Sequence, residues 1–342
     1  MKEGDSGPRI PPHHPGTPWA SASEFISTIR VPTPFPVGPV NVHLIRREPI
    51  TLVDVGPLSD DAWTALALGL RAHGLGMKDV QRILLTHAHH DHFGLAARVA
   101  DASGAQILGG APDERPFGMR RNAKLLLDAM ARAGFDTLSR FSVVASIAWV
   151  DRFAEPLPAW DALEGGEILP GDGYSVRIRS TPGHTPGSLT FEIPEAGVLF
   201  TGDTVLHGIT PNAVVVEDPE NPGEPFRSLS RYFETLDAIE QANKTATLLT
   251  GHGKSIADYA GHRRGVARRA ALRQDRIEAE LRAGPRTIRE LVTRLFPRVT
   301  ALNVFLAFSE VAGFLMYLED LGRVRKLRER TRDRYRLTVS SS

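Results

Sequence analysis

A short run of metal-binding side chains, directly after an apolar segment, constrains this chain more than any other feature. Residues 86–92 read Thr-His-Ala-His-His-Asp-His and follow an apolar Ile-Leu-Leu segment. Imidazole and carboxylate are the usual ligands of zinc and similar divalent ions. On a strand that ends in a tight loop, His87 and His89 share a face, and the turn can bring Asp91 and His92 back toward them. The run therefore predicts a metal site at the end of a strand.

Three more candidate ligands occur later in the chain, each after an apolar, strand-like run. Each has glycine beside it, which permits close backbone approach and unusual backbone angles. These residues are His184, Asp203 and His252. A histidine cluster alone could be a solvated loop. His184, Asp203 and His252 supply the further ligands that a complete metal site would need. The repetition favours a metal centre.

These motifs resemble the metallo-β-lactamase-fold hydrolase superfamily over roughly residues 25–258, and within it the glyoxalase II-like branch. The resemblance implies the α+β class and an αββα sandwich with a site at one edge of its sheets. It also implies two divalent metal ions per chain and a hydroxide shared between them. In that arrangement the first ion would be held by His87, His89 and His184, the second by Asp91, His92 and His252, and both by Asp203.

The implied centre would give the chain a nucleophile at neutral pH. Two cations a few Å apart lower the pKa of the water between them from about 15.7 to near 7. They also polarise the carbonyl or phosphoryl oxygen under attack. Asp91 would orient the water and take its proton, which makes it the catalytic residue. Zinc is the metal expected for such ligands, and iron and manganese occupy similar sites.

Two absences narrow the resemblance. The chain contains no cysteine, whereas the true β-lactamases of this fold mostly carry a cysteine ligand in the second site. Only 48 residues separate Asp203 from His252, too few for the large domain that some related nucleases insert there. The resemblance therefore implies hydrolysis of a small-molecule acyl substrate such as a thioester, an ester or a lactone.

The chain divides into three regions by its composition. Residues 1–24 are rich in proline and poor in apolar residues, so we expect a flexible arm. Residues 25–260 form the expected hydrolase domain, with a helical insertion at about 112–160 that is either a packing flap or a lid over the site. Residues 261–342 predict three helices and a short hairpin, which resembles a winged-helix module.

The C-terminal region is basic. It holds 19 Lys and Arg against 9 Asp and Glu, a net charge of +10, whereas the remaining 22 basic and 31 acidic residues give −9. Such a tail could follow phosphates, so an RNA-cleaving enzyme is the alternative hypothesis. The tail could equally complete the substrate pocket or join subunits in a homo-oligomer. A non-enzymatic binding module is a third hypothesis, and the complete ligand set argues against it.

The sequence indicates no membrane segment. No run approaches the roughly 18 apolar residues that a transmembrane helix needs, and the first 20 residues lack the apolar stretch of a secretory signal. We therefore expect a cytoplasmic protein.

Overall fold

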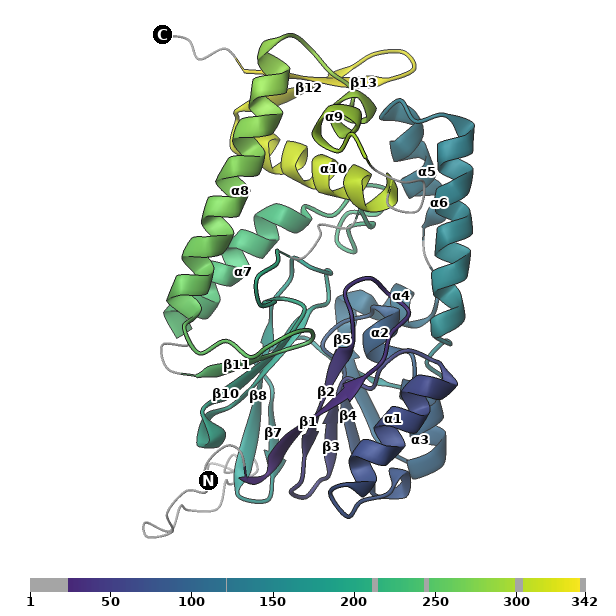
Figure 1. Ribbon diagram of the computed structural model, residues 1–342, viewed down its shortest axis with the longest axis vertical. Coiled ribbons are helices and arrows are strands. Elements are labelled where there is room, and N and C mark those ends of the chain that lie inside the picture. Colours follow the sequence, from purple (N-terminus) through teal and green to yellow (C-terminus); the bar gives the residue numbers. More distant parts are fainter. Residues whose placement is uncertain (1–23, 121, 211–214, 243–245, 299–303, 339–342) are drawn as a thin grey trace, which may run out of the picture.

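A computed structural model describes residues 24–120, 122–210, 215–242, 246–298 and 304–338. The arm predicted for residues 1–24 lies outside these ranges apart from Glu24. Two sheets lie face to face, with helices on the outer face of the first sheet and a mainly helical region at one end (Figure 1). No helix in the described residues is long and apolar enough to cross a bilayer.

The first sheet has six strands, antiparallel from β1 to β3 and parallel from there to β6. In spatial order they are β1 (Ile26–Val31), β2 (Val40–Ile45), β3 (Thr51–Val53), β4 (Arg82–Leu84), β5 (Gln106–Gly110) and β6 (Asp161–Leu163). The second sheet has five strands, in which β10 and β11 are parallel and the others antiparallel. Its order is β11 (Thr247–Thr250), β10 (Val198–Gly202), β9 (Leu189–Ile193), β8 (Tyr174–Ser180) and β7 (Ile168–Gly171).

Alternation along the strands explains how both faces of the first sheet are buried. Ile83 and Leu85 point toward the helices on the outer face, whereas Leu84 between them points toward the second sheet. Strands covered on both faces have continuous apolar runs, which is why the Ile-Leu-Leu segment before the metal loop has no polar position. This burial holds the start of the metal loop rigidly.

Several helices begin at residues whose side chains cap them. Ser59 caps α1 and Asn122 caps α5, and Thr287 forms a capping box with Glu290 at the start of α9. The helices before the C-terminal region are α1 (Asp60–Arg71), α2 (His90–Phe93), α3 (Ala96–Ser103), α4 (Glu114–Phe117), α5 (Ala123–Arg132), α6 (Thr137–Val150) and α7 (Ser228–Ala242). Single 3₁₀ turns are η2 (Met77–Asp79), η3 (Ala111–Asp113), η4 (Asp151–Phe153) and η5 (Pro194–Ala196).

The C-terminal region has the predicted order of three helices and an antiparallel hairpin. These elements are α8 (Tyr259–Arg282), α9 (Ile288–Leu295), α10 (Val304–Asp320), β12 (Val324–Arg328) and β13 (Asp333–Leu337). Their apolar side chains share one core cluster with α5, α6, α7 and the strand pair β10–β11, through residues such as Phe308, Leu236 and Leu248. Arg132 of α5 donates to Asp333 of the hairpin at 3.0 Å. The insertion therefore packs against the C-terminal helices, and the boundary near residue 260 stays a prediction.

Candidate metal centre

Four segments that carry predicted ligands meet at one edge of the sandwich. Backbone bonds of 2.8 Å join them, from the Leu189 amide to the Thr86 carbonyl and from the Gly251 amide to the Gly202 carbonyl. Gly202 has a φ of 47°, and a side chain there would collide with that of Thr86. Glycine is therefore required where the second sheet approaches the metal loop.

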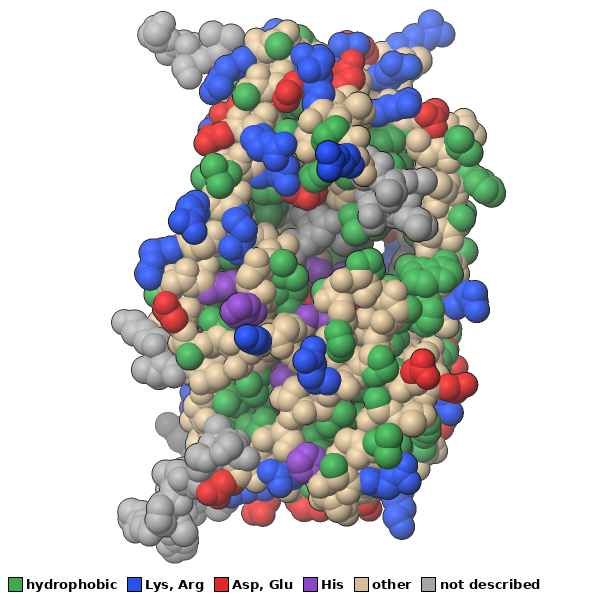
Figure 2. Space-filling model, in the orientation of Figure 1, with side chains coloured by type: hydrophobic (Ala, Val, Ile, Leu, Met, Phe, Trp, Pro, Cys, Tyr) green, Lys and Arg blue, Asp and Glu red, His purple; other side chains and the backbone are tan. Residues whose placement is uncertain are grey.

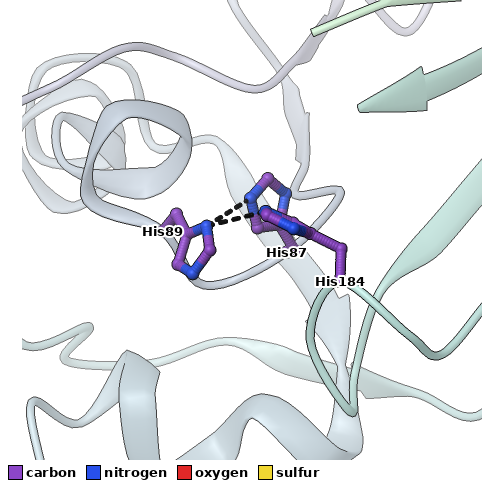
Figure 3. A group of neighbouring side chains, drawn as sticks. All are labelled: His87, His89 and His184. Atoms are coloured by element: carbon purple, nitrogen blue, oxygen red, sulfur yellow. Dashed lines mark hydrogen bonds between the residues drawn. The ribbon is translucent and has the colours of Figure 1, made fainter. Parts of the chain in front are cut away.

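His87, His89 and His184 form the first group. Nδ1 of His89 lies 3.1 Å from Nε2 of His87 and 2.9 Å from Nε2 of His184, so three ring nitrogens converge on one point (Figure 3). His87 and His89 come from the loop after β4, and His184 comes from the loop between β8 and β9. Three imidazole nitrogens at this spacing could hold one cation.

Asp91, His92 and His252 form the second group, with Asp203 between the two groups. Nε2 of His252 lies 3.2 Å from Oδ2 of Asp91. Asp203 directs Oδ2 toward His184 of the first group at 3.7 Å, and Oδ1 toward His92 at 3.4 Å and His252 at 3.7 Å. The structure thus brings all seven predicted residues together, with Asp203 in a bridging position.

The side chains fit a pair of divalent ions. Nε2 of His92, Nε2 of His252 and Oδ1 of Asp203 are buried without a hydrogen-bond partner among the described residues. Buried polar atoms without partners are costly, and cations bound between them would satisfy all three.

The protonation states of the first group and of Asp203 suit a cation. Burial lowers the pKa of His87 and His89 well below its usual value, and neighbouring histidines lower it further. Burial alone would raise the pKa of Asp203, but His92 and His252 hold it well below its usual range. Burial alone would lower the pKa of His92 and His252, but Asp203 raises it above its usual value, so a metal ion bound in the second group would displace their protons.

Hydrogen bonds from outside the seven residues orient the rings. Nδ1 of His92 lies 2.7 Å from Oδ2 of Asp54, and Oδ1 of Asp54 accepts from the Thr86 amide at 2.8 Å. Nδ1 of His252 donates to the Pro39 carbonyl at 3.0 Å, which directs Nε2 into the site. Such partners fix the tautomer and ring orientation of metal-binding histidines. No role was predicted for Asp54 from the sequence, although its position in Asp-Val-Gly after β3 was a usable signal.

Asp113 is a second functional residue for which the sequence predicted no role. This fully buried carboxylate accepts from the Ala88 amide at 2.9 Å, the Gly187 amide at 2.8 Å and the Thr185 hydroxyl at 2.8 Å. It therefore ties the loop that carries His87 to the loop that carries His184. Its one sequence signal is its place in an acidic pair, Asp113 and Glu114, shortly after the glycines that end β5.

Replacing Asp113 with alanine should weaken both the fold and metal binding. Three buried donors would lose their acceptor, which should lower the free energy of unfolding by about 3 kcal/mol or more. Metal affinity should fall roughly 10- to 100-fold because the two ligand loops lose their link. Denaturant unfolding and chelator competition measure the two effects. Asp136→Ala, which removes the cap of α6, is a control that should cost about 1 kcal/mol without changing metal affinity.

Comparisons with known proteins agree with this geometry. Residues 35–252, which include all seven candidate ligands, match the model of the metallo-beta-lactamase superfamily. The probable metallo-hydrolase YqjP of Bacillus subtilis is 28% identical over 305 residues, 87% of this chain and 93% of the relative.

Two further relatives are similar over different shares of the chain. A crystal structure of a metallo-beta-lactamase family protein from Thermus thermophilus superposes with a TM-score of 0.76 at 27% identity, and covers 92% of this chain and 98% of its own. The hydroxyacylglutathione hydrolase GloC of Haemophilus influenzae is 32% identical over 126 residues, 37% of this chain and 50% of the relative. The chain therefore belongs to the metallo-beta-lactamase superfamily and is a metal-dependent hydrolase of that fold.

Proposed function

We propose that the chain is a dinuclear hydrolase of acyl compounds, which cleaves a thioester, an ester or a lactone. The convergence of seven buried or nearly buried side chains, with Asp203 between two ligand groups, carries the proposal. Two divalent ions held there, zinc foremost, would supply an activated water and a Lewis acid at neutral pH. His87, His89 and His184 would hold one ion, and Asp91, His92 and His252 the other.

Asp91 is the proposed catalytic residue. Burial alone would raise the pKa of Asp91, but His92 and the neighbouring His252 outweigh it and lower the pKa below its usual value. The carboxylate is therefore ionised at neutral pH and can accept a proton from the attacking water. Its Oδ2 is held 3.2 Å from Nε2 of His252, which fixes its direction.

An aromatic cluster on a segment that contacts the metal loop supports an acyl substrate. Phe35, Trp149 and Phe153 form a cluster of edge-to-face rings with centroids 5.1–5.9 Å apart. Asp151, within the same segment, lies 3.1 Å from His90, so the segment that carries Trp149 and Phe153 contacts the His87–His92 run. Trp149 is 43% exposed, which leaves its ring available to an acyl group.

Three other large apolar residues of the insertion lie elsewhere. Met130 and Phe135 are buried in the core shared with the C-terminal helices, and Met119 packs at the edge of the core under the first sheet. Unlike these three residues, Trp149 has a ring that is partly exposed. The name of the relative GloC gives an acyl derivative of glutathione as its substrate, which supports the same class.

The structure offers less support for the RNA-cleaving alternative. In winged-helix proteins that bind DNA, one helix enters the major groove. The third helix here, α10, contains no Lys or Arg, and its apolar side chains are mostly buried. Exposed arginines of the hairpin, such as Arg328, Arg330 and Arg332, could still contact phosphates. RNA therefore belongs in the substrate panel beside thioesters, esters and lactones.

Asp91→Asn should lower kcat roughly 100-fold or more on the best acyl substrate of that panel, and change KM little. The amide cannot take the proton, whereas the residues around the acyl group are unchanged. Steady-state kinetics with the metal content of each sample measured alongside test this. Asp101→Asn, an exposed carboxylate of α3, is the matched control. Unchanged turnover at full metal content would remove Asp91 from the mechanism, and cleavage of RNA alone would overturn the acyl proposal.

A further inference from the structure

A second group of basic side chains borders the candidate metal centre. It consists of His207, which follows Asp203 in the chain, and of His262 and Arg269 on α8. Histidine side chains gather near the middle of the face drawn in Figure 2, beside Lys and Arg side chains that follow α8. We call these three residues the basic rim.

The rim is anchored to two of the ligand-bearing segments. His207 lies four residues after Asp203, so their Cα atoms are at most about 14 Å apart. A β-bridge between Leu206 and Ile209 reverses the chain there and leaves His207 exposed. Gly253 follows His252 directly in the chain. A Cβ atom placed on Gly253 would lie 3.9 Å from the Cβ atom of His207. The rim therefore lies beside the second ligand group.

Arg269 is placed by contacts on both sides. Its Nε donates to the Thr210 hydroxyl at 3.3 Å, in the same loop as His207. A Cβ atom placed on Gly265 would lie 3.4 Å from one guanidinium nitrogen of Arg269. The glycine therefore leaves room for the guanidinium to lie along the helix. His262, one helical turn before Gly265, is therefore on the same side of α8 as Arg269.

The three residues of the basic rim, with the positive charge of Arg269 among them, have no carboxylate partner in the described residues. Nε2 of His262 is buried without a hydrogen-bond partner there. Burial lowers the pKa of His262, and the nearby charges of Arg269 and His207 lower it further. Within the described ranges, no carboxylate lies within ion-pair distance of His207, His262 or Arg269, although Arg263 on the same helix is paired with Asp237. An arginine that lacks a carboxylate partner and lies beside two histidines attracts anions.

We propose that the basic rim binds a negatively charged part of the acyl substrate, either a phosphate or a carboxylate on the group that leaves. The proposal rests on the acyl-hydrolase function above and names its substrate class, an acyl compound of an anionic thiol or alcohol. Arg269 would donate to the anion with its guanidinium, and Nε2 of His262 would gain the partner it lacks. The aromatic cluster and the rim would then hold the two halves of the substrate.

Three thioesters with the same acyl group separate the possibilities. An N-acetylcysteamine thioester is neutral, a glutathione thioester adds carboxylates, and a coenzyme A thioester adds phosphates. Wild type should have a higher kcat/KM for one of the two anionic substrates. Arg269→Ala should reduce the ratio of anionic to neutral kcat/KM by about 10-fold, the loss expected for one charge-assisted hydrogen bond. His262→Gln, which keeps a donor at this position, should reduce it less than His262→Ala.

Arg264→Ala is the matched control. Arg264 is an exposed arginine of the same helix, and its side chain points about 200° away from that of His262. The Arg264→Ala substitution removes the same charge without changing the rim. The ratio of anionic to neutral kcat/KM should therefore stay at the wild-type value. An equal loss in both arginine variants would show that only the general charge of α8 matters, and would overturn the proposal.

A direct measurement of thiol binding tests the basic rim independently of the hydrolase activity. Titration calorimetry with coenzyme A and with glutathione should show weaker binding of the preferred thiol to Arg269→Ala than to wild type or Arg264→Ala. Hydrolysis of all three thioesters at equal rates, with no binding of either thiol, would overturn the rim and leave the hydrolase proposal standing. Thiol binding that depends on Arg269, without hydrolysis of any of the three thioesters, would support the anion-binding role of the rim and overturn the hydrolase proposal.

Discussion

Replacing Asp203 with alanine should empty the metal centre and lower acyl hydrolysis by well over 100-fold. Its two oxygens face both ligand groups, so the change removes a ligand from each. Loss of an outer partner already costs about 10- to 100-fold in metal affinity, and loss of a direct ligand should exceed that. Elemental analysis should find close to two ions per chain in the wild type and fewer than one in the variant.

Two controls make this result specific. Glu220→Ala removes an exposed carboxylate from a later part of the same connection between β10 and α7, and should leave metal content and rate unchanged. Far-ultraviolet circular dichroism should show that Asp203→Ala keeps its secondary structure. A wild-type protein purified without metal, and unable to take up zinc, iron or manganese, would contradict the assignment of all seven residues.

Deleting residues from 262 onward should prevent stable folding, not merely change activity. The deletion would expose core residues on three elements that remain, among them Leu236 of α7, Leu248 of β11 and Met130 of α5. Each large apolar side chain that loses its cover costs about 1.5–3 kcal/mol. A few such losses equal the whole stability of a domain, about 5–15 kcal/mol.

Solubility, thermal unfolding and size-exclusion chromatography of the truncated chain measure this outcome. The control removes charge without touching the core, by changing the exposed Arg325, Arg328, Arg330 and Arg332 of the hairpin region to alanine. This variant should keep the wild-type melting temperature, and any loss of RNA binding or of self-association would assign that role to the hairpin. A truncated chain that folds and melts like the wild type would show that residues 262–342 are an independent unit.

The ligand set and most of the secondary structure could be predicted because they depend on local patterns. The Ile-Leu-Leu run before His87 reflects a strand buried on both faces, and glycine beside each later ligand reflects close backbone approach. The capping box at Thr287 and the helical spacing of α10 are also local, since each involves residues three or four positions apart. The family resemblance then placed these pieces in a known sandwich, which the comparisons support.

Only the tertiary structure decided which distant residues serve the site. Asp113 joins loops that lie 25 and 72–74 residues away in the chain, and Arg269 meets the loop of His207 across 59 residues. It also showed what α5 of the insertion packs against, since Arg132 contacts Asp333 of the hairpin. The spacing of residues along the sequence does not predict such distant pairs. They form when sheets and helices bury their apolar faces against each other, and that packing depends on the whole chain at once.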